Sequence, residues 1–392
     1  MATVSYIGAD VDSKTVDLAV ERNRRIVKRM RVKVSIAELR EALGSIPRPR
    51  ELTFEEGPMA QWLYRNLRDC VDRLVVCDPR RNGLITDDGD SDDAIDAGKL
   101  ALLLRGGFLR AVHHSDDEAH VDFKQWVGLY EDRTREAVRQ INKIRGRCQM
   151  HGLRPAPGSV GNPTIRNRWL DGLKEHPGAS QLRMLWNGYD ACRQQAGYAR
   201  REMQRRSRRY PMIAAWKDLP GMGPVRSATL MAYLETPWRF ANNPRKLWKY
   251  CGVGLERSSS GKDKQGKPRV GHLQLAWKVN RRLKSAVMGA AVSAIRQGQN
   301  VFAEHYRRLL EQGSEPGNAR HGVARKMLTV MWGMWKTQTR YDAAWVLGPS
   351  QSRRRSVRSV VLGHKGPPPC AEAARAEPPA RKRPRGGGTT IG

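Results

Sequence analysis

The sequence predicts an α/β domain with a mixed sheet at the N-terminus, followed by a long helical region and a mostly helical C-terminal domain. Apolar strand-like runs separated only by turns open the chain, and helix and strand patterns then alternate to about residue 105. A highly charged, helix-forming stretch comes next. A chain of 392 residues is long enough for two or three such domains.

The elements of the first domain, expected over residues 1–112, follow in order. We expect strands at Thr3–Val11, Thr15–Glu21, Ile26–Val34, Glu51–Phe54 and Arg73–Cys77, and helices from the cap Ser35 to Leu43, over Met59–Cys70, and from Ser91–Asp92 to about Arg105. Three successive strands and then alternating helices and strands fit an RNase H-like sheet. A flavodoxin-like fold is the alternative, but it needs a helix between all its parallel strands, and the first three strands have none.

The rest of the chain divides into three parts. Residues 113–210 are helix-forming on both sides of the Gly- and Pro-rich stretch Pro155–Pro163, which predicts two long antiparallel helices in a coiled-coil-like arm. Paired apolar stripes on such an arm would favour a homo-oligomer. A second, mostly helical domain is expected at 211–345, and the Arg-, Pro- and Gly-rich residues 346–392 are expected to form a disordered basic tail.

Charge is strongly positive and unevenly distributed. The formal net charge is +32, yet residues 1–100 carry 18 acidic and 17 basic side chains, so the excess lies beyond residue 100. This predicts a polyanionic partner, DNA or RNA, held by residues 101–392. We expect a cytoplasmic protein rather than a membrane-bound one, because no apolar run approaches the length of a spanning helix and the N-terminus resembles no targeting signal.

Four carboxylates of the first domain form a candidate metal site. Asp10 and Glu55 each end an apolar run, where partial desolvation makes a charge costly, and Asp93 and Asp96 lie at i and i+3 on one helix face. Oxygen ligands suit Mg²⁺ or Mn²⁺, and two such ions can hold both the attacking and leaving oxygens of a phosphodiester. The ordinary alternatives are strand ends at turns for Asp10 and Glu55 and a dipole-stabilising role for Asp93.

The C-terminal domain carries two local signals. Leu219-Pro220-Gly221-Met222-Gly223-Pro224 precedes a helix, a helix-hairpin-helix-like pattern in which Gly221 and Gly223 would let the backbone approach a DNA phosphate; an ordinary tight turn is the alternative. Ser258-Ser259-Ser260-Gly261 then precedes a basic run. Taken alone, this segment is typical of a flexible phosphate-binding loop, because a serine needs activation to act as a nucleophile.

Several basic residues are expected to contact nucleic acid. They are Lys262, Lys264, Lys267 and Arg269 of that loop, and Arg205 and Arg206 of the second long helix. A solvated helix face is the alternative for the two arginines, but the basic surroundings favour phosphate contact.

In their order and spacing these motifs resemble the DEDD-type insertion-sequence transposases, which include the Piv-type DNA invertases and the bridge-RNA-guided serine recombinases. The resemblance extends from residue 3 to about residue 340 and rests on Ile7-Gly8-Ala9-Asp10-Val11, Glu55-Glu56-Gly57-Pro58, Asp93 and Asp96 with Ala97, Leu100 and Ala101, Pro220-Gly221-Met222-Gly223, and Gly254-Leu255 followed by Ser-Gly. The chain departs from the family at the second glutamate, Glu56, and at Ser91-Asp92, where a basic residue and Thr are frequent.

The resemblance implies a RuvC-like magnesium site made by the four carboxylates and a covalent DNA nucleophile at Ser260, with Ser258 and Ser259 as alternatives. It further implies donor and target DNA as substrates, a structured non-coding guide RNA, assembly as a dimer or tetramer, and a bacterial, nucleoid-associated location. Two alternatives belong to other classes: a RuvC-like metal nuclease that hydrolyses without a serine nucleophile, and a nucleic-acid-binding scaffold without catalysis.

Overall fold

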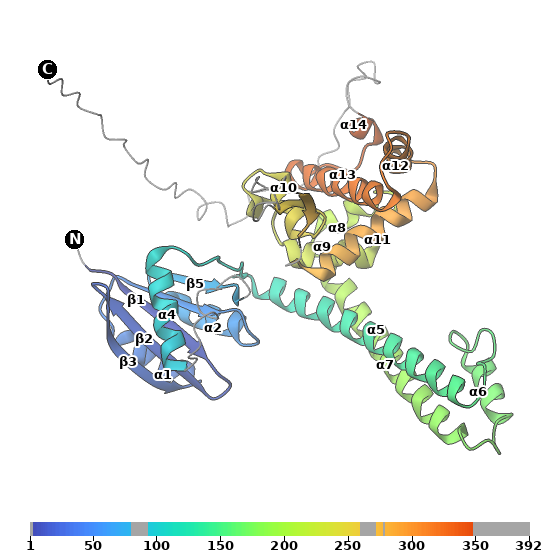
Figure 1. Cartoon of the computed structure of the whole chain (residues 1–392), viewed down its shortest axis with the longest axis horizontal. Helices are drawn as coiled ribbons and strands as arrows, with labels where there is room; N and C mark the ends of the chain where they lie inside the picture. The colour runs from blue at the N-terminus through green and yellow to red at the C-terminus, as the bar shows by residue number, and fades with distance from the viewer. Residues whose placement is uncertain (1–2, 80–92, 259–271, 277–278, 348–392) are drawn as a thin grey trace, which may run out of the picture.

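A computed structural model describes residues 3–79, 93–258, 272–276 and 279–347 of the chain. Figure 1 shows a sheet domain at the N-terminus, two long helices side by side, and a helical domain at the C-terminal end of the described chain. The fold is therefore mixed α/β at the start and helical thereafter, as the sequence predicts. No helix in the described part of the chain is both long and apolar enough to cross a bilayer.

Five strands form the N-terminal sheet in the order β3-β2-β1-β4-β5. They are β1 (Ser5–Val11), β2 (Thr15–Arg22), β3 (Arg25–Lys33), β4 (Arg50–Glu55) and β5 (Arg73–Cys77). The pairs β1–β2 and β2–β3 are antiparallel, whereas β1–β4 and β4–β5 are parallel. The all-parallel sheet of the flavodoxin-like alternative is therefore excluded. The strand positions agree with those expected from the sequence to within two residues.

Helices cover both faces of this sheet. They are α1 (Ile36–Gly44), α2 (Ala60–Leu67), which continues as the short 3-10 helix η1 (Arg68–Cys70), and α4 (Asp93–Gly106). Ile7 and Ala9 of β1 share a buried core with Leu39 of α1 and Leu63 of α2. The intervening Gly8 faces α4, because alternate residues of a strand point to opposite faces. Ser35 occupies the N-cap of α1 as expected, although its side chain makes no capping hydrogen bond.

Two long helices connect the domains. They are α5 (Glu118–Met150) and α7 (Ala179–Ser207), joined through α6 (Pro163–Asp171) at the far tip. Figure 1 shows them packed antiparallel, and Trp186, Leu182, Ile144 and Leu170 belong to a small core near the tip. Helix α5 ends five residues before Pro155, and α6 begins with Pro163, so the Gly- and Pro-rich stretch forms the predicted interruption.

The C-terminal domain is mostly helical around one large core. Its elements are α8 (Pro211–Trp216), α9 (Pro224–Leu234), η3 (Pro237–Phe240), α10 (Pro244–Tyr250), β6 (Leu255–Ser258), β7 (His272–Leu275), α11 (Arg281–Gln297), α12 (Val301–Glu311), α13 (Pro316–Thr337) and α14 (Ala343–Leu347). Phe123 and Val127 of α5 belong to the same core, so this helix begins inside the C-terminal domain. The antiparallel pair β6–β7 was not expected from the sequence; it flanks the segment 259–271.

Candidate functional site

Two candidate carboxylates end neighbouring strands of the sheet. In the parallel pair β1–β4 the last paired residues are Ala9 and Phe54, and the next residue along each strand is Asp10 and Glu55. Asp10 is two residues beyond Gly8, and Glu55 is two beyond Thr53, the register partner of Gly8. Both side chains therefore point to the α4 face of the sheet, at the same edge. Two widely separated sequence motifs thus meet at one place.

Helix α4 approaches this edge because of a glycine. A Cβ atom built on Gly8 would lie 2.0 Å from the carbonyl oxygen of Ala97 and 2.6 Å from the amide nitrogen of Ala101, so the helix backbone rests directly on β1. Further along α4, Arg105 forms a 3.6 Å ion pair with Glu21, whose register partner Tyr6 lies near the start of β1. The helix therefore runs antiparallel to β1.

This direction places the first turn of α4 toward the carboxylate edge, which is the end of β1 opposite Tyr6. Asp96 lies in that turn; its Oδ1 atom is buried and has no hydrogen-bond partner among the described residues, while Lys99 Nζ lies 3.6 Å away. Asp93 begins the same helix, and its side chain is outside the described residues. Within the part of the chain that the structure describes, no group of three or more His, Cys, Asp or Glu side chains is arranged to hold a metal ion.

A further carboxylate near this edge, Asp17, was missed by the sequence reasoning. Asp17 of β2 is the register partner of Asp10, so the two side chains share a face, and Arg31 of β3 binds Asp17 with two hydrogen bonds of 3.0 Å. Like charges directly opposite on antiparallel strands are destabilising. Arg31 offsets this repulsion. The available signal was an acidic residue inside the apolar run that contains Leu18, Ala19 and Val20.

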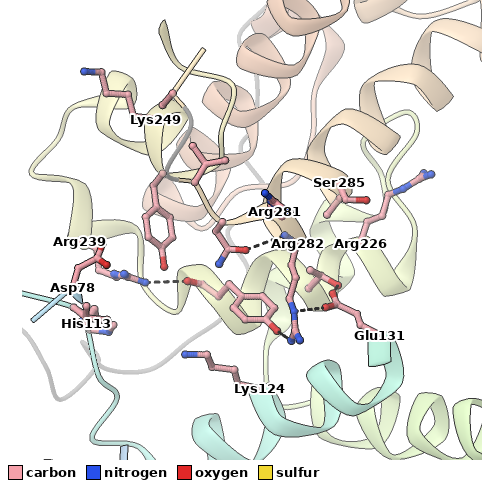
Figure 2. Close-up of a pocket in the computed structure, with 18 of the residues that line it drawn as sticks. Asp78, His113, Lys124, Glu131, Arg226, Arg239, Lys249, Arg281, Arg282 and Ser285 are labelled. Atoms are coloured by element: carbon pink, nitrogen blue, oxygen red, sulfur yellow. Dashed lines mark hydrogen bonds and ion pairs between the residues drawn. The ribbon is translucent and has the colours of Figure 1, made fainter. Parts of the chain in front are cut away.

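A cleft of about 1870 Å³ separates the sheet domain from the C-terminal domain. One side is lined by Glu56 and Asp78, which follow β4 and β5, and by the residues Arg110–His113. The other side is lined by α5, α9, η3, α10 and α11, and Figure 2 shows many of their polar side chains directed into this space. The cleft is thus built by elements from both domains, and no local sequence motif predicts it.

The lining of this cleft is strongly basic. It includes nine Lys and Arg side chains against four Asp and Glu: Arg110, Lys124, Arg135, Arg226, Arg239, Lys246, Lys249, Arg281 and Arg282 against Glu56, Asp78, Glu131 and Glu256. An excess of cations in a concave surface raises the local concentration of polyanions. The cleft is therefore a suitable binding surface for nucleic-acid phosphates.

Aromatic and acidic neighbours hold some of these cations in place. Arg282 of α11 pairs with Glu131 at 3.1 Å and with Asp132 at 3.2 Å, and it also donates to the hydroxyl of Tyr233. Burial raises the pKa of Glu131, while the charge of Arg282 opposes that increase. Arg239 lies over the ring of Tyr250 at 4.9 Å. Such contacts fix the position of a guanidinium and reduce the entropy lost when it binds a phosphate.

Described residues on either side of the candidate nucleophile segment line the cleft. Glu256 of β6 and Ala276, which follows β7, both line it, and these two strands flank residues 259–271. Ser258 ends β6, and its side chain is not described. Ser259, Ser260, Lys262, Lys264, Lys267 and Arg269 lie outside the described residues. Their predicted roles therefore stay predictions.

The Pro-Gly-Met-Gly turn has a structural role that its sequence did not reveal. Gly221 has φ +79°, and a Cβ atom there would lie 2.2 Å from the carbonyl oxygen of Ala290 and 2.6 Å from the amide nitrogen of Ala294. This glycine therefore lets α11 pack against the turn inside the protein. Gly223 differs, because none of the described atoms lies within 4 Å of its Cβ position. Only Gly223 leaves space for an external group.

The two predicted phosphate-binding arginines of α7 differ in the same way. Arg206 is bound by Asp122 and by Glu202, and its guanidinium lies over the ring of Trp126 at 4.8 Å. Arg205 pairs only with Glu202 among the described residues and leaves 65% of its side chain exposed. Arg206 therefore joins α7 to α5, and Arg205 is the better placed of the two for an external phosphate.

Comparison with known proteins supports a nucleic-acid enzyme. Residues 214–307 match the family model described as Transposase IS116/IS110/IS902 family. The matched segment runs from α8 into α12 and includes the turn at Gly221, the strands β6 and β7, and most of the C-terminal wall of the cleft. No curated protein matches the chain. The family match supports a transposase role in an insertion sequence, and DNA binding with it.

Proposed function

We propose that this chain is the transposase, or recombinase, of an insertion sequence and that it cuts and rejoins DNA through a phosphoserine intermediate in the basic cleft. One observation carries the proposal. The cleft lies between the sheet domain, with its carboxylate edge, and the β6–β7 pair that flanks the serine segment, and that pair lies within the transposase match. Bridge-RNA guidance and a dimer or tetramer belong to the proposal through the resemblance alone.

The sheet domain is proposed to be RuvC-like. Support comes from the strand order β3-β2-β1-β4-β5, in which three antiparallel strands precede two that extend the sheet in parallel, as RNase H-like sheets do. Asp10, Glu55, Asp93 and Asp96 would hold Mg²⁺ or Mn²⁺. Their all-oxygen chemistry fits these ions, and the buried Oδ1 of Asp96 has no hydrogen-bond partner among the described residues to offset its desolvation. When bound, the metal would stabilise negative charge at the scissile phosphate.

The remaining steps fall to side chains of the chain itself. The hydroxyl of Ser260, with Ser258 and Ser259 as alternatives, attacks the phosphorus, and the displaced strand leaves with a free hydroxyl. A hydroxyl from the second DNA strand later attacks the phosphoserine, so joining conserves the bond energy and needs no ATP. Cleft cations such as Lys246 and Arg281 hold the flanking phosphates while this exchange takes place.

Carboxylate variants test the catalytic half of the proposal. Asp10→Ala, Glu55→Ala and Asp96→Ala should each lower strand cleavage by about 10³-fold or more, since several kcal/mol of transition-state stabilisation would be lost. Glu51→Ala is the matched control, because Glu51 lies on the same strand and face as Glu55 but pairs with Arg73 at 3.0 Å. Nucleic-acid affinity should stay unchanged in all four variants. Full cleavage in two carboxylate variants would contradict the metal site.

Serine variants separate the recombinase from the nuclease. Each of Ser258, Ser259 and Ser260 is replaced by alanine, and a covalent protein–DNA adduct is sought on denaturing gels with a nicked suicide substrate. One replacement should abolish both the adduct and cleavage. Cleavage without any adduct in the wild-type chain would instead favour the RuvC-like hydrolytic nuclease, for which the carboxylate edge would suffice.

A further inference from the structure

The segment of residues 107–117, here called the linker, connects α4 of the sheet domain to α5. It first extends the sheet: the amide of Val112 donates to the carbonyl of Val76 at 2.7 Å, and the amide of Asp78 donates to the carbonyl of Arg110 at 3.1 Å. It then enters α5, whose N-cap is the side chain of Asp117. Between these two anchored ends lie the adjacent histidines His113 and His114.

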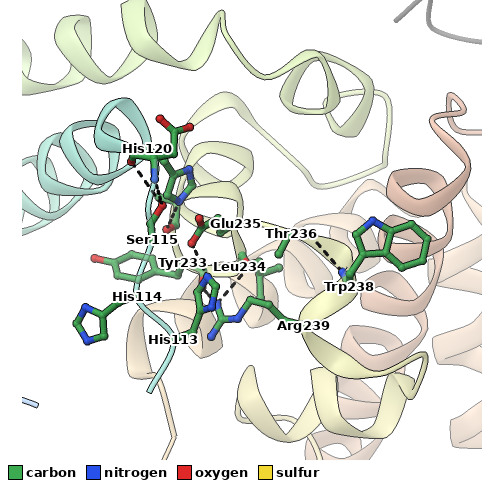
Figure 3. A network of polar contacts seen from close by, with 12 residues as sticks. His113, His114, Ser115, His120, Tyr233, Leu234, Glu235, Thr236, Trp238 and Arg239 are labelled. Atoms are coloured by element: carbon green, nitrogen blue, oxygen red, sulfur yellow. Dashed lines mark hydrogen bonds and ion pairs between the residues drawn. The ribbon is translucent and has the colours of Figure 1, made fainter. Parts of the chain in front are cut away.

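His113 contacts the C-terminal domain. Its Nε2 atom lies 2.7 Å from Oε2 of Glu235, the residue that follows α9. Burial opposes the ionisation of Glu235, but hydrogen bonds from His113 and Ser115 hold its pKa at about 2. Glu235 is therefore an ionised partner for His113 throughout the neutral range. Figure 3 shows this contact together with the neighbouring chain around Arg239.

The backbone that presents Glu235 is fixed. Glu235 has φ +62°, a left-handed conformation that side-chain-bearing residues adopt only at a cost. Arg239 stabilises this backbone conformation, because its guanidinium donates hydrogen bonds to the carbonyls of Tyr233 at 3.0 Å and Leu234 at 3.2 Å. The surrounding structure thus fixes the position of the Glu235 carboxylate, which binds His113 of the linker.

His114 contacts the sheet domain. Its Nε2 atom lies 2.6 Å from Oε2 of Glu56 and its Nδ1 atom lies 2.8 Å from Oε1 of Gln61. The imidazole also lies against the ring of Tyr64, at 5.3 Å between centroids, and only 5% of the His114 side chain is exposed. Gln61 in turn donates to the carbonyl of Ser115 at 2.9 Å. Adjacent residues of the linker therefore bind carboxylates of two different domains, Glu235 of the C-terminal domain and Glu56 of the sheet domain.

We propose that His113 and His114 form a latch that sets the spacing between the sheet domain and the C-terminal domain and so acts as a pair of positioning residues for the reaction in the cleft. Glu56 directly follows the carboxylate Glu55, and both Glu56 and His113 line the cleft. The positioning role rests on the proposed function, because it requires the carboxylate edge and the serine segment to act on one phosphate. The contacts of the latch, and the domain spacing that they set, do not depend on the proposed function.

The latch is tested on the full chain with two spin labels. One replaces Val27 of β3, which is 57% exposed, and the other replaces the exposed Gln312 that follows α12. Cys70 and Cys370 are first changed to serine so that labelling is specific. Distances are measured by pulsed electron resonance in the His113→Gln and His114→Gln variants. The control is Arg65→Gln, which removes the exposed 3.1 Å pair with Glu118 at the same junction.

We expect a narrow distance distribution in the parent and control chains and a broader or shifted one in each histidine variant. Exchanging the partners, with His113→Glu and Glu235→His together, should restore the narrow distribution. In a strand-cleavage assay each histidine variant should lose about 10- to 100-fold in kcat while KM for DNA stays within twofold, because misplaced reacting groups lower the rate and not the binding.

Unchanged distances in both histidine variants would overturn the latch. If the His113→Gln variant fails to fold, as judged by circular dichroism, the chain with His113→Glu and Glu235→His takes its place. If that chain does not recover the parent distance, the latch is contradicted equally. If the parent chain cleaved no DNA, the proposed function would be contradicted but the latch would not, because the distance measurement needs no activity. Broadened distances with unchanged kcat would overturn the positioning role.

Discussion

The sheet domain and the C-terminal domain use charged side chains in opposite ways. In the sheet domain, cations are matched to acids along the strands, as in Arg31–Asp17 at 2.9 Å and Arg73–Glu51 at 3.0 Å. In the C-terminal domain, cations face the cleft in excess and are held by aromatic rings, as Arg239 is by Tyr250. The difference indicates a division of work. Under the proposed function, the sheet edge would supply the carboxylates and the basic wall of the C-terminal domain would bind phosphate.

The two domains nevertheless share one packing device. Gly8 in β1 and Gly221 before α9 each let a helix backbone approach so closely that a Cβ atom would lie within 2.0 and 2.2 Å, respectively, of a carbonyl oxygen. In both cases the helix that approaches, α4 or α11, carries residues of the candidate site. Both glycines therefore set the position of a helix that carries candidate site residues, and neither needs to touch nucleic acid for this role.

Alanine substitutions at these glycines should give the largest stability effect. Gly8→Ala and Gly221→Ala should each lower the free energy of unfolding by about 3 kcal/mol or more, because the added methyl meets backbone atoms and Gly221 also has a positive φ. Gly223→Ala is the control and should cost less than about 1 kcal/mol, since its backbone is extended and its surroundings are open. Urea unfolding followed by circular dichroism measures all three.

The opposite result at Gly221 would restore the first hypothesis. If Gly221→Ala left the unfolding free energy unchanged and weakened DNA binding, the turn would be a phosphate-binding element and not a packing contact. The same experiment in the sheet domain has no such alternative, because Gly8 of β1 lies directly against the backbone of α4.

Much of the fold was predictable because local signals decided it. Apolar strand-like runs separated by turns after Val11 and Arg22 predicted the first three strands to within two residues. The role of Gly221 was not predictable, because the helix that needs its small size begins sixty residues later, at Arg281. Asp17 was missed since its partner, Arg31, is revealed only by the register of β2 and β3.

The arginine pair of α7 provides a smaller, adjacent test. Arg206→Gln should lower the free energy of unfolding by about 2 kcal/mol, because it removes contacts to Asp122, Glu202 and Trp126. Arg205→Gln should change stability by less than about 0.5 kcal/mol, since its only described pair is exposed, and should instead weaken nucleic-acid binding. Equal stability losses would contradict the distinction. The two residues are neighbours in the sequence, so helix propensity is controlled.

The cleft could not be predicted from the sequence at all. Its lining comes from segments as distant as Glu56 and Gly289, and each contributing stretch reads as an ordinary charged helix or loop. The uneven charge predicted that a polyanion binds beyond residue 100, but not that the sheet domain supplies the opposite wall. The contact of His113 in the linker with Glu235, and the packing of α5 in the C-terminal core, create that arrangement.

The salt dependence of nucleic-acid binding should show the smallest effect. It also tests the difference between the two domains most directly. Replacing Arg110, Lys246 and Arg281 of the cleft together by Gln should reduce the slope of log K against log salt by about 2 to 3, because each phosphate contact releases counterions. The control replaces three exposed cations of the sheet domain, Lys14, Arg24 and Arg25, and should leave the slope unchanged. Fluorescence anisotropy at several salt concentrations measures both. Equal slopes for the two triple variants would mean that cations on any surface of the protein bind nucleic acid equally well. The proposal that the C-terminal domain binds phosphate in the cleft would then be wrong.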